Sequence, residues 1–282
     1  MEVKYPDTLV VTATLGDRPT LSRTIDSVRR IGGNRVKHVI VAPAAACRMI
    51  REKYPHLTVL QEPTHSRGIY SALNFGLKTF AREYKYLTYI NDDDFWYPEF
   101  QVLFQAMDEK DTDVVYGRVN FLDAEGHVIG EQTSSPRYKD FGNLLYQEVI
   151  LFTQQATLTR SELFLRLGGF DESFKLIADT KFWLEAIQAK AKFRYINKIC
   201  AAYTIHDGQL SANKKLQREE HEQLVLLNEI ANPFKVMFDV LLFRLWNLRI
   251  YLKRLKNKLS RSRINYLKAV KLLLKVMVVL IP

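Results

Sequence analysis

Short apolar runs alternate with longer amphipathic runs over the first ninety residues, and this alternation constrains the fold more than any other feature of the sequence. Strands are predicted at residues 8–14, 37–41, 57–61 and 86–91, with helices between them at residues 20–30, 44–54 and 69–84. The order βαβαβαβ is typical of an α/β fold with a mostly parallel sheet flanked by helices. In such folds ligands bind at the carboxyl ends of the strands.

The order of elements is less regular after residue 91. A hairpin is predicted from strands at residues 114–122 and 127–131, followed by a strand near 150–159, helices at 161–167 and 179–190, and a strand at 193–203. With 282 residues, 47% of them hydrophobic, the chain can bury a large core, so the disordered class is excluded. The two cysteines lie far apart, which excludes a disulfide framework, and the N-terminal segment does not resemble a signal peptide. We therefore expect a cytoplasmic body that ends near residue 232.

The net charge of +10 is concentrated in the last fifty residues. Residues 233–282 contain seven lysines and five arginines against one acid, a charge of +11, which leaves −1 for residues 1–232. Leucines recur there at steps of four and three residues, at Leu241, Leu245, Leu248, Leu252, Leu255 and Leu259. This spacing predicts a basic amphipathic helix, followed by a second segment over residues 264–281. Because lysines interrupt that segment, we expect the tail to lie on an anionic membrane surface rather than cross it; a leucine seam packed on the body or in a homodimer is the alternative.

Three adjacent acids, Asp92, Asp93 and Asp94, follow the predicted strand at residues 86–91. Adjacent carboxylates repel one another, so we expect a cation among them at the mouth of the sheet. Mg²⁺ and Mn²⁺ prefer oxygen ligands and often share their sites with substrate phosphates, which indicates a metal–nucleotide complex. A helix-capping or solvated acidic loop before Pro98 is the alternative.

Four further segments accompany the acidic run: GIYSALNFG at residues 68–76, GGFDE at 168–172, ADTKFWL at 178–184 and IHDGQLS at 205–211. In this order they resemble the inverting family 2 glycosyltransferases of GT-A fold, over about residues 8–211. The resemblance implies a GT-A type, Rossmann-like domain over residues 1–232, with a nucleotide-binding half (1–118) and an acceptor-binding half (119–232). The basic helical extension (233–282) follows it.

The resemblance implies that a nucleotide diphosphate sugar is the donor and that Mn²⁺ or Mg²⁺ binds its diphosphate. Asp94 is the expected metal ligand, with Asp92 and His206 as further ligands and with Asp93 touching metal, ribose or sugar. A second carboxylate must take the proton from the acceptor hydroxyl, and by its position in the family pattern this general base is Asp179. The other role open to Asp179 is that of an N-cap for the following helix, and His206 is as readily a structural residue.

Two sets of binding residues also follow from the resemblance. The nucleotide sugar is expected to contact Thr12, Thr14, Arg18, Arg67, Gly68, Asn74, Asp92 and Asp93. The acceptor is expected to contact Trp96, Gln155, Trp183 and Lys181, although core packing explains Trp183 equally well. Asp171 and Glu172 are expected to form a structural turn.

The sequence departs from the family pattern at four positions where acids are usual: Ala42, Ser66, Ser71 and Arg118. Uracil recognition is therefore in doubt, and a catalytically inactive membrane-surface scaffold is the alternative function, although the retention of Asp94 and Asp179 favours an enzyme. A nucleotidyltransferase would give Asp179 no role, and nucleic-acid binding would leave the leucine seam unexplained. The resemblance and the basic tail together imply a lipid-linked saccharide acceptor of bacterial surface polysaccharide synthesis, at the inner face of the cell membrane.

Overall fold

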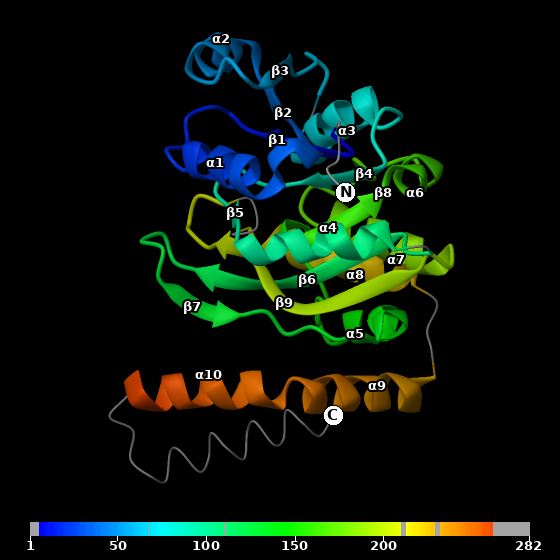
Figure 1. The fold of residues 1–282 in the computed structure, drawn as a ribbon. Helices are drawn as coiled ribbons and strands as arrows, with labels where there is room; N and C mark the ends of the chain where they lie inside the picture. The colour runs from blue at the N-terminus through cyan, green and yellow to red at the C-terminus, as the bar shows by residue number, and fades with distance from the viewer. Residues whose placement is uncertain (1–5, 67, 110, 210–212, 229–231, 262–282) are drawn as a thin grey trace.

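The computed structural model describes residues 6–66, 68–109, 111–209, 213–228 and 232–261, with side chains up to residue 256 (Figure 1). One nine-stranded sheet runs through the body, and helices cover both of its faces. The strand order is β3-β2-β1-β4-β8-β6-β9-β5, and β7 pairs with β6. The predicted α/β fold with a helix-flanked sheet is therefore confirmed.

The first half of the sheet consists of parallel β–α units. Its elements are β1 (Thr8–Ala13), α1 (Leu21–Gly32), β2 (Val36–Ala42), α2 (Ala44–Lys53), β3 (Thr58–Gln61), α3 (Ile69–Phe80) and β4 (Tyr86–Tyr89). Strand β1 lies between β2 and β4 and is parallel to both, while β3 continues the parallel order beyond β2. Strands β1 and β4 are buried over almost their whole length, which is why they form continuous apolar runs in the sequence.

The second half of the sheet is mixed. It contains β5 (Phe95–Trp96), β6 (Val114–Leu122), β7 (Val128–Glu131), β8 (Thr157–Arg160) and β9 (Phe193–Thr204). Strand β8 is antiparallel to both β4 and β6, whereas β6 and β9 are parallel. The carboxyl ends of β1, β4, β6 and β9 therefore meet at one edge of the sheet, together with the amino end of β8. Parallel pairing is thus less extensive than expected, and the expected division of the domain at residue 118 falls inside β6.

Several elements of this half are not predicted from the sequence. Helices α6 (Ser161–Arg166) and α7 (Ala178–Gln188) agree with the prediction, but α4 (Gln101–Asp108), α5 (Phe141–Leu145) and α8 (Lys214–Leu227) are additional. The strand expected over residues 150–159 begins only at Thr157, because Gln154–Ala156 forms a 3₁₀ turn. Helix α8 is highly charged and buries Glu220 and Leu224. A helix whose inner face includes a carboxylate gives little apolar periodicity to detect.

The basic extension packs beneath the body as two helices, α9 (Pro233–Trp246) and α10 (Leu248–Arg261) (Figure 1). They are separated at Asn247, whose Oδ1 accepts from the Ser134 N–H at 3.1 Å and whose Nδ2 donates to the Ser134 carbonyl at 3.0 Å. Asp239 of α9 is 2% exposed and forms ion pairs with Arg137 and Lys235. These buried polar contacts fix the orientation of the extension on the body.

The predicted leucine seam is divided between two sides of the extension. The side that faces the body buries Val240, Phe243, Ile250 and Leu255. The outer side exposes the seam residues Leu245, Leu248 and Leu252, together with Phe234, Phe238 and Trp246. The side chain of Leu259 and the segment over residues 264–281 lie outside what the structure describes. None of the helices in the described part of the chain is both long and apolar enough to span a membrane.

Candidate active site

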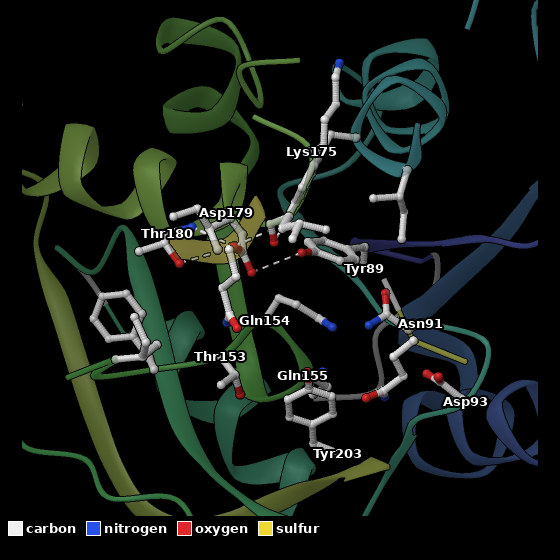
Figure 2. A pocket seen from close by; sticks show the side chains of 18 of the residues that line it. Tyr89, Asn91, Asp93, Thr153, Gln154, Gln155, Lys175, Asp179, Thr180 and Tyr203 are labelled. Carbon is white, nitrogen blue, oxygen red and sulfur yellow. Dashed lines mark hydrogen bonds between the residues drawn. The ribbon is translucent and has the colours of Figure 1, made fainter. Parts of the chain in front are cut away.

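A pocket of about 600 Å³ opens at the edge where the strand ends meet (Figure 2). Its wall includes Ala13 at the end of β1, Asn91 just after β4 and Tyr203 near the end of β9. Gln154 and Gln155 join it from the turn before β8. A pocket of this size can enclose most of a ligand as large as a nucleotide sugar, and it lies at the edge at which α/β sheets bind their ligands.

One corner of the pocket is acidic. Asp92 and Asp93 both line it, and the guanidinium of Arg18 lies between them, with Nε at 3.2 Å from Asp92 Oδ1 and Nη1 at 3.7 Å from Asp93 Oδ2. Thr14 donates a 2.6 Å hydrogen bond to the other oxygen of Asp92. Burial, with the charge of Asp93 in addition, raises the pKa of Asp92. The corner therefore favours a cation, and Arg18 supplies the positive charge there.

His206 lies beside this acidic corner but is outside the pocket wall. Its Nε2 lies 2.9 Å from Asp93 Oδ2 and 2.8 Å from Arg18 Nη1. Asp93 Oδ1 is buried and has no hydrogen-bond partner among the described residues. Carboxylate oxygens are the ligands that Mg²⁺ and Mn²⁺ prefer, and a cation would give this orphaned oxygen a partner. Asp92 and Asp93 are therefore the pocket residues that could hold a divalent metal. Among the described residues, however, Asp92, Asp93 and His206 do not form a group whose ligand atoms all lie within 4.8 Å of one another.

Asp94 lies behind the pocket rather than in its wall. It is 0% exposed, and its Oδ1 accepts from the Thr204 N–H at 2.8 Å. Its Oδ2 accepts from Gln155 Nε2 at 2.7 Å and from Asn91 Nδ2 at 3.2 Å. Burial, and then the charge of Asp93, raise the pKa of Asp94 well above its ordinary value. The sequence assigns the metal first to Asp94, whereas this position is that of a buried support that joins the ends of β4, β8 and β9.

Asp179 lines the opposite wall from the first turn of α7 (Figure 2). Its Oδ1 accepts from the Thr180 N–H at 2.7 Å, and the hydroxyl groups of Tyr70 and Tyr89 each lie 3.2 Å from one of its oxygens. Burial raises the pKa of Asp179, although these hydrogen bonds oppose the shift. The N-cap residue of α7 is Ile177, so Asp179 does not have the capping role. A held carboxylate with a raised pKa is suited to accept a proton.

Helix α8 fixes the loop that leads to Asp179. The Glu220 carboxylate is buried and accepts hydrogen bonds from the backbone N–H groups of Lys175, Leu176 and Ile177. Helix α8 also contributes pocket-lining residues, namely Lys214, Gln217, Arg218 and His221. Because α8 is not predicted, sequence reasoning misses all of these residues, and it also misses Tyr70, Tyr89 and Gln154. Tyr70 lies in the segment at residues 68–76 that resembles the family, and Tyr89 lies in the predicted strand at residues 86–91. Nothing in the spacing of these two segments indicates that either tyrosine contacts Asp179.

Asn74 supports the same loop from α3. It is 2% exposed, and it exchanges hydrogen bonds with the backbone of Phe170 at 2.8 and 2.9 Å. At Gly169 the φ angle is +86°, and a Cβ atom there would lie 2.7 Å from Asn74 Oδ1, so this position requires glycine. Asp171 forms the expected turn by accepting from Ser173. Asn74, an expected nucleotide-sugar contact, is outside the pocket wall.

Two expected acceptor contacts also lie elsewhere. Trp96 is 2% exposed and stacks on Phe100 with ring centroids 3.8 Å apart, so it belongs to the core beneath the sheet. Lys181 forms ion pairs with Asp171 and Glu185 and is outside the pocket wall. Lys181 comes two residues after Asp179 in the same helix, and side chains with this spacing do not face each other.

The other predicted residues divide between the pocket and its surroundings. Gln155 and Trp183 line the pocket, although both are almost fully buried. Thr12 is buried in β1 and donates to the Ile90 carbonyl at 2.8 Å. Gly68 comes directly before α3 with a φ angle of +86° and is not in the wall. Arg67 lies outside the described residues.

A different group of potential metal ligands occurs on the β6–β7 turn. The ligand atoms of Asp123, Glu125 and His127 all lie within 4.8 Å of one another. Glu125 and His127 are exposed, and the group is outside the pocket wall. Exposed acidic groups of this kind are common without a metal, so no role is assigned to it.

Comparison with protein families and curated proteins gives a consistent match. The family model described as "Glycosyl transferase family 2" matches residues 9–168, more than half of the chain. An uncharacterized glycosyltransferase of Rickettsia typhi is 28% identical over 164 residues, which cover 56% of this chain and 50% of the relative. A second from Rickettsia prowazekii matches at the same identity and coverage. The chain thus spans about half the length of the curated relatives it matches.

Solved structures are similar at the level of the fold. A fragment of S. aureus TarS in complex with UDP-GlcNAc superposes with a TM-score of 0.59 at 17% identity, over 81% of this chain and 69% of that one. The Pyrobaculum calidifontis mannosyltransferase PcManGT, in complex with GDP-Man and Mn²⁺, superposes with a TM-score of 0.55 at 17% identity, over 98% of this chain and 81% of that one. The GT-A fold is therefore confirmed.

Proposed function

Because the chain belongs to glycosyl transferase family 2, we propose that it is a metal-dependent, inverting glycosyltransferase that moves a sugar from a nucleotide diphosphate sugar to a hydroxyl group of a saccharide. The observation that carries this proposal is that Asp179 lines the same pocket as Asp92 and Asp93, on the opposite wall. A single-step displacement at the anomeric carbon needs a base on the acceptor side and charge stabilisation on the leaving-group side. One pocket that contains both supports this reaction.

The acidic corner is the proposed site of the donor diphosphate. Asp92, Asp93 and His206 would hold Mn²⁺ or Mg²⁺, and the orphaned Asp93 oxygen supports this assignment. When bound, the metal would neutralise charge that develops on the departing nucleoside diphosphate. Arg18 would then turn from the carboxylates to the phosphate oxygens, for which its planar group of donors is well suited. The complexes of TarS with UDP-GlcNAc and of PcManGT with GDP-Man and Mn²⁺ support a donor of this class.

Asp179 is the proposed general base. One of its carboxylate oxygens would accept the proton of the acceptor hydroxyl while the hydroxyl oxygen attacks the anomeric carbon. The bond from that carbon to the nucleoside diphosphate breaks in the same step, and the diphosphate leaves with the bonding electrons. The hydroxyl groups of Tyr70 and Tyr89 would hold the carboxylate in position, since each lies 3.2 Å from it. Burial raises the pKa of Asp179, which strengthens it as a base.

A thermal-shift screen of nucleoside diphosphates and nucleotide sugars, each with and without Mn²⁺, tests the donor assignment. A ligand at about 100 times its Kd stabilises the native state by about 2.7 kcal/mol. For a chain of this size that corresponds to a rise in Tm of roughly 5–10 °C. We expect one nucleotide to give such a rise only when Mn²⁺ is present. Absence of a metal-dependent shift with every nucleotide would favour the non-catalytic scaffold instead.

The acceptor is proposed to be a lipid-linked saccharide of bacterial surface polysaccharide synthesis, with the protein bound to the inner face of the cell membrane. Support comes from the outer side of α9 and α10, where Trp246 and Leu252 are 56% and 51% exposed beside basic residues. Asp239 and Asn247 fix this side away from the body. Apolar side chains flanked by Lys and Arg bind anionic bilayers through insertion and through about 1 kcal/mol for each basic residue near the surface.

Liposome co-sedimentation with the double variant Trp246→Glu/Leu252→Glu tests the membrane assignment. We expect the wild-type chain to bind vesicles that contain anionic lipid and the variant to lose most of this binding. Met49→Glu is the matched control, because Met49 is also exposed but lies on α2, at the far end of the molecule from the tail (Figure 1). If the double variant keeps its vesicle binding but dissociates a dimer in light scattering, the outer side is a homodimer interface and the membrane proposal fails.

A further inference from the structure

Gln154 is a buried side chain whose hydrogen-bonding groups are unused. It lies in the 3₁₀ turn before β8, is 5% exposed and lines the pocket. Neither its Nε2 nor its Oε1 has a partner among the described residues. A buried carboxamide without partners destabilises the fold, because it has lost its hydrogen bonds to water without replacement. Such a group at a pocket wall is explained if a ligand supplies the missing partners.

The neighbours of Gln154 in the chain have the same property. Gln155 uses its Nε2 to donate to Asp94, while its buried Oε1 has no partner in the part of the chain that the structure describes. The buried Thr153 hydroxyl likewise finds no partner among the residues described. In Figure 2 Gln154 lies between Asp179 and Asp93, with Thr153 and Gln155 beside it. The floor of the pocket therefore carries uncharged donors and acceptors with free capacity.

The chemistry of these groups indicates the class of ligand. A carboxamide both donates and accepts, as does a sugar hydroxyl, so the two pair without a net charge. A phosphate would instead be matched by cations or by a cluster of N–H groups. The three uncharged side chains thus complement a polyhydroxylated ring rather than a diphosphate.

We infer that Gln154 binds hydroxyl groups of the sugar that is transferred, and that it sets which sugar the enzyme accepts. This inference rests on the proposed function. The sugar must extend from a diphosphate in the acidic corner toward the base, and Gln154 lies along that path (Figure 2). Discrimination by a buried hydrogen-bonding group is strong, because a sugar that lacks the matching hydroxyl leaves that group unpaired.

Gln154→Leu in the full chain tests the inference by binding alone. Leucine has a similar size and no polar group, so the unliganded variant should melt at the wild-type temperature or above it. With Mn²⁺ present, calorimetry would compare a nucleotide sugar with the corresponding nucleoside diphosphate. We expect the variant to bind the diphosphate like wild type and to bind the nucleotide sugar about 10- to 100-fold more weakly than wild type.

Gln132→Leu is the matched control. Gln132 is 3% exposed, and neither of its side-chain polar atoms has a partner within the described ranges, but it lies outside the pocket wall. Gln132→Leu should leave the affinities for the nucleoside diphosphate and for the nucleotide sugar unchanged. If Gln154→Leu does not fold, Gln154→Asn keeps the carboxamide one methylene further back, and we expect the same selective loss of nucleotide-sugar affinity.

Three results would overturn the inference. Unchanged nucleotide-sugar affinity in Gln154→Leu would make the residue structural, and equal losses for both ligands would place it at the nucleotide. An effect confined to the acceptor KM would mean that Gln154 binds the acceptor saccharide instead. Failure of the wild-type chain to bind any nucleotide sugar is distinct from these results, because it would refute the proposed function itself.

Discussion

Replacing Asp94 by alanine should destabilise the fold, whereas replacing Asp93 by alanine should abolish metal-dependent nucleotide binding in an intact fold. The two acids are adjacent in sequence but have different surroundings. Asp94 is 0% exposed and accepts hydrogen bonds from Thr204, Gln155 and Asn91. Asp93 lines the pocket and has one oxygen without a partner among the described residues.

The magnitude for Asp94→Ala follows from the three donors that it leaves unpaired. Each buried unpaired donor costs about 1–3 kcal/mol. Desolvation of the carboxylate, which raises the pKa of Asp94, offsets part of what these bonds contribute. We therefore expect a net loss of about 2–4 kcal/mol in the free energy of unfolding. For a chain of this size, the corresponding fall in Tm is roughly 5–15 °C.

Asp93→Ala should change Tm little, by less than roughly 3 °C, because two effects oppose each other. It removes the contacts of Oδ2 with Arg18 and His206, but it also removes a buried oxygen without a partner among the described residues and the repulsion between Asp93 and its acidic neighbours. Thermal melts of both variants, followed by titration with a nucleotide in Mn²⁺, make the comparison. The reasoning is refuted if Asp94→Ala melts like wild type and loses the Mn²⁺ response, while Asp93→Ala keeps it. That result would return the metal to Asp94, as the sequence suggests.

Because the pKa of Asp179 is raised and only its ionised form accepts a proton, kcat should begin to fall, as the pH is lowered, at a pH above the ordinary titration range of aspartate. A pH–rate profile whose acid limb lies within the ordinary range would count against this prediction. The same shift means that the fold gains stability as the pH falls through the pKa that Asp179 has in the folded state. Asp179→Asn should remove this pH dependence from the melting temperature. Glu220→Ala should lower kcat by about tenfold or more and leave nucleotide affinity nearly unchanged, because the loop before Asp179 loses its anchor. Asn247→Ala should lower Tm by roughly 2–6 °C, since both backbone groups of Ser134 lose their partner, and an unchanged melt would contradict this role.

The first half of the fold could be predicted because its signals are local. Buried parallel strands are continuous apolar runs, and the helices between them have regular apolar faces. The edge that holds the pocket follows from this order, since the carboxyl ends of parallel strands lie together. The acidic run after the predicted strand at residues 86–91 identifies Asp92 and Asp93 as candidate site residues, and the resemblance to family 2 glycosyltransferases identifies Asp179. All three line the pocket.

The direction of individual side chains could not be predicted. Asp92, Asp93 and Asp94 come after the end of β4, where no periodicity indicates which acid faces the pocket. Trp96 belongs to the two-residue strand β5, which is too short to leave a pattern. Without a structure, an aromatic residue next to an acidic run is equally consistent with a sugar platform and with the core.

Contacts over long sequence separations account for the rest. The Glu220 carboxylate accepts from backbone groups more than forty residues earlier, so its burial in a charged helix leaves no local signal. In the extension, the leucine spacing suggests one continuous seam. Asn247 divides it because its side chain pairs with Ser134, which lies 113 positions away.

Donor binding and turnover of Asp179→Asn, measured side by side in Mn²⁺ with the nucleotide sugar found in the thermal-shift screen, test the proposed mechanism most directly. We predict that donor affinity stays close to that of the wild-type chain, because Asp179 lies across the pocket from the acidic corner. Turnover should fall by about 10²- to 10⁴-fold, the usual contribution of a general base. Turnover close to that of the wild type would contradict the assignment of Asp179 as the base, and loss of donor binding would contradict the separation of the donor site from it.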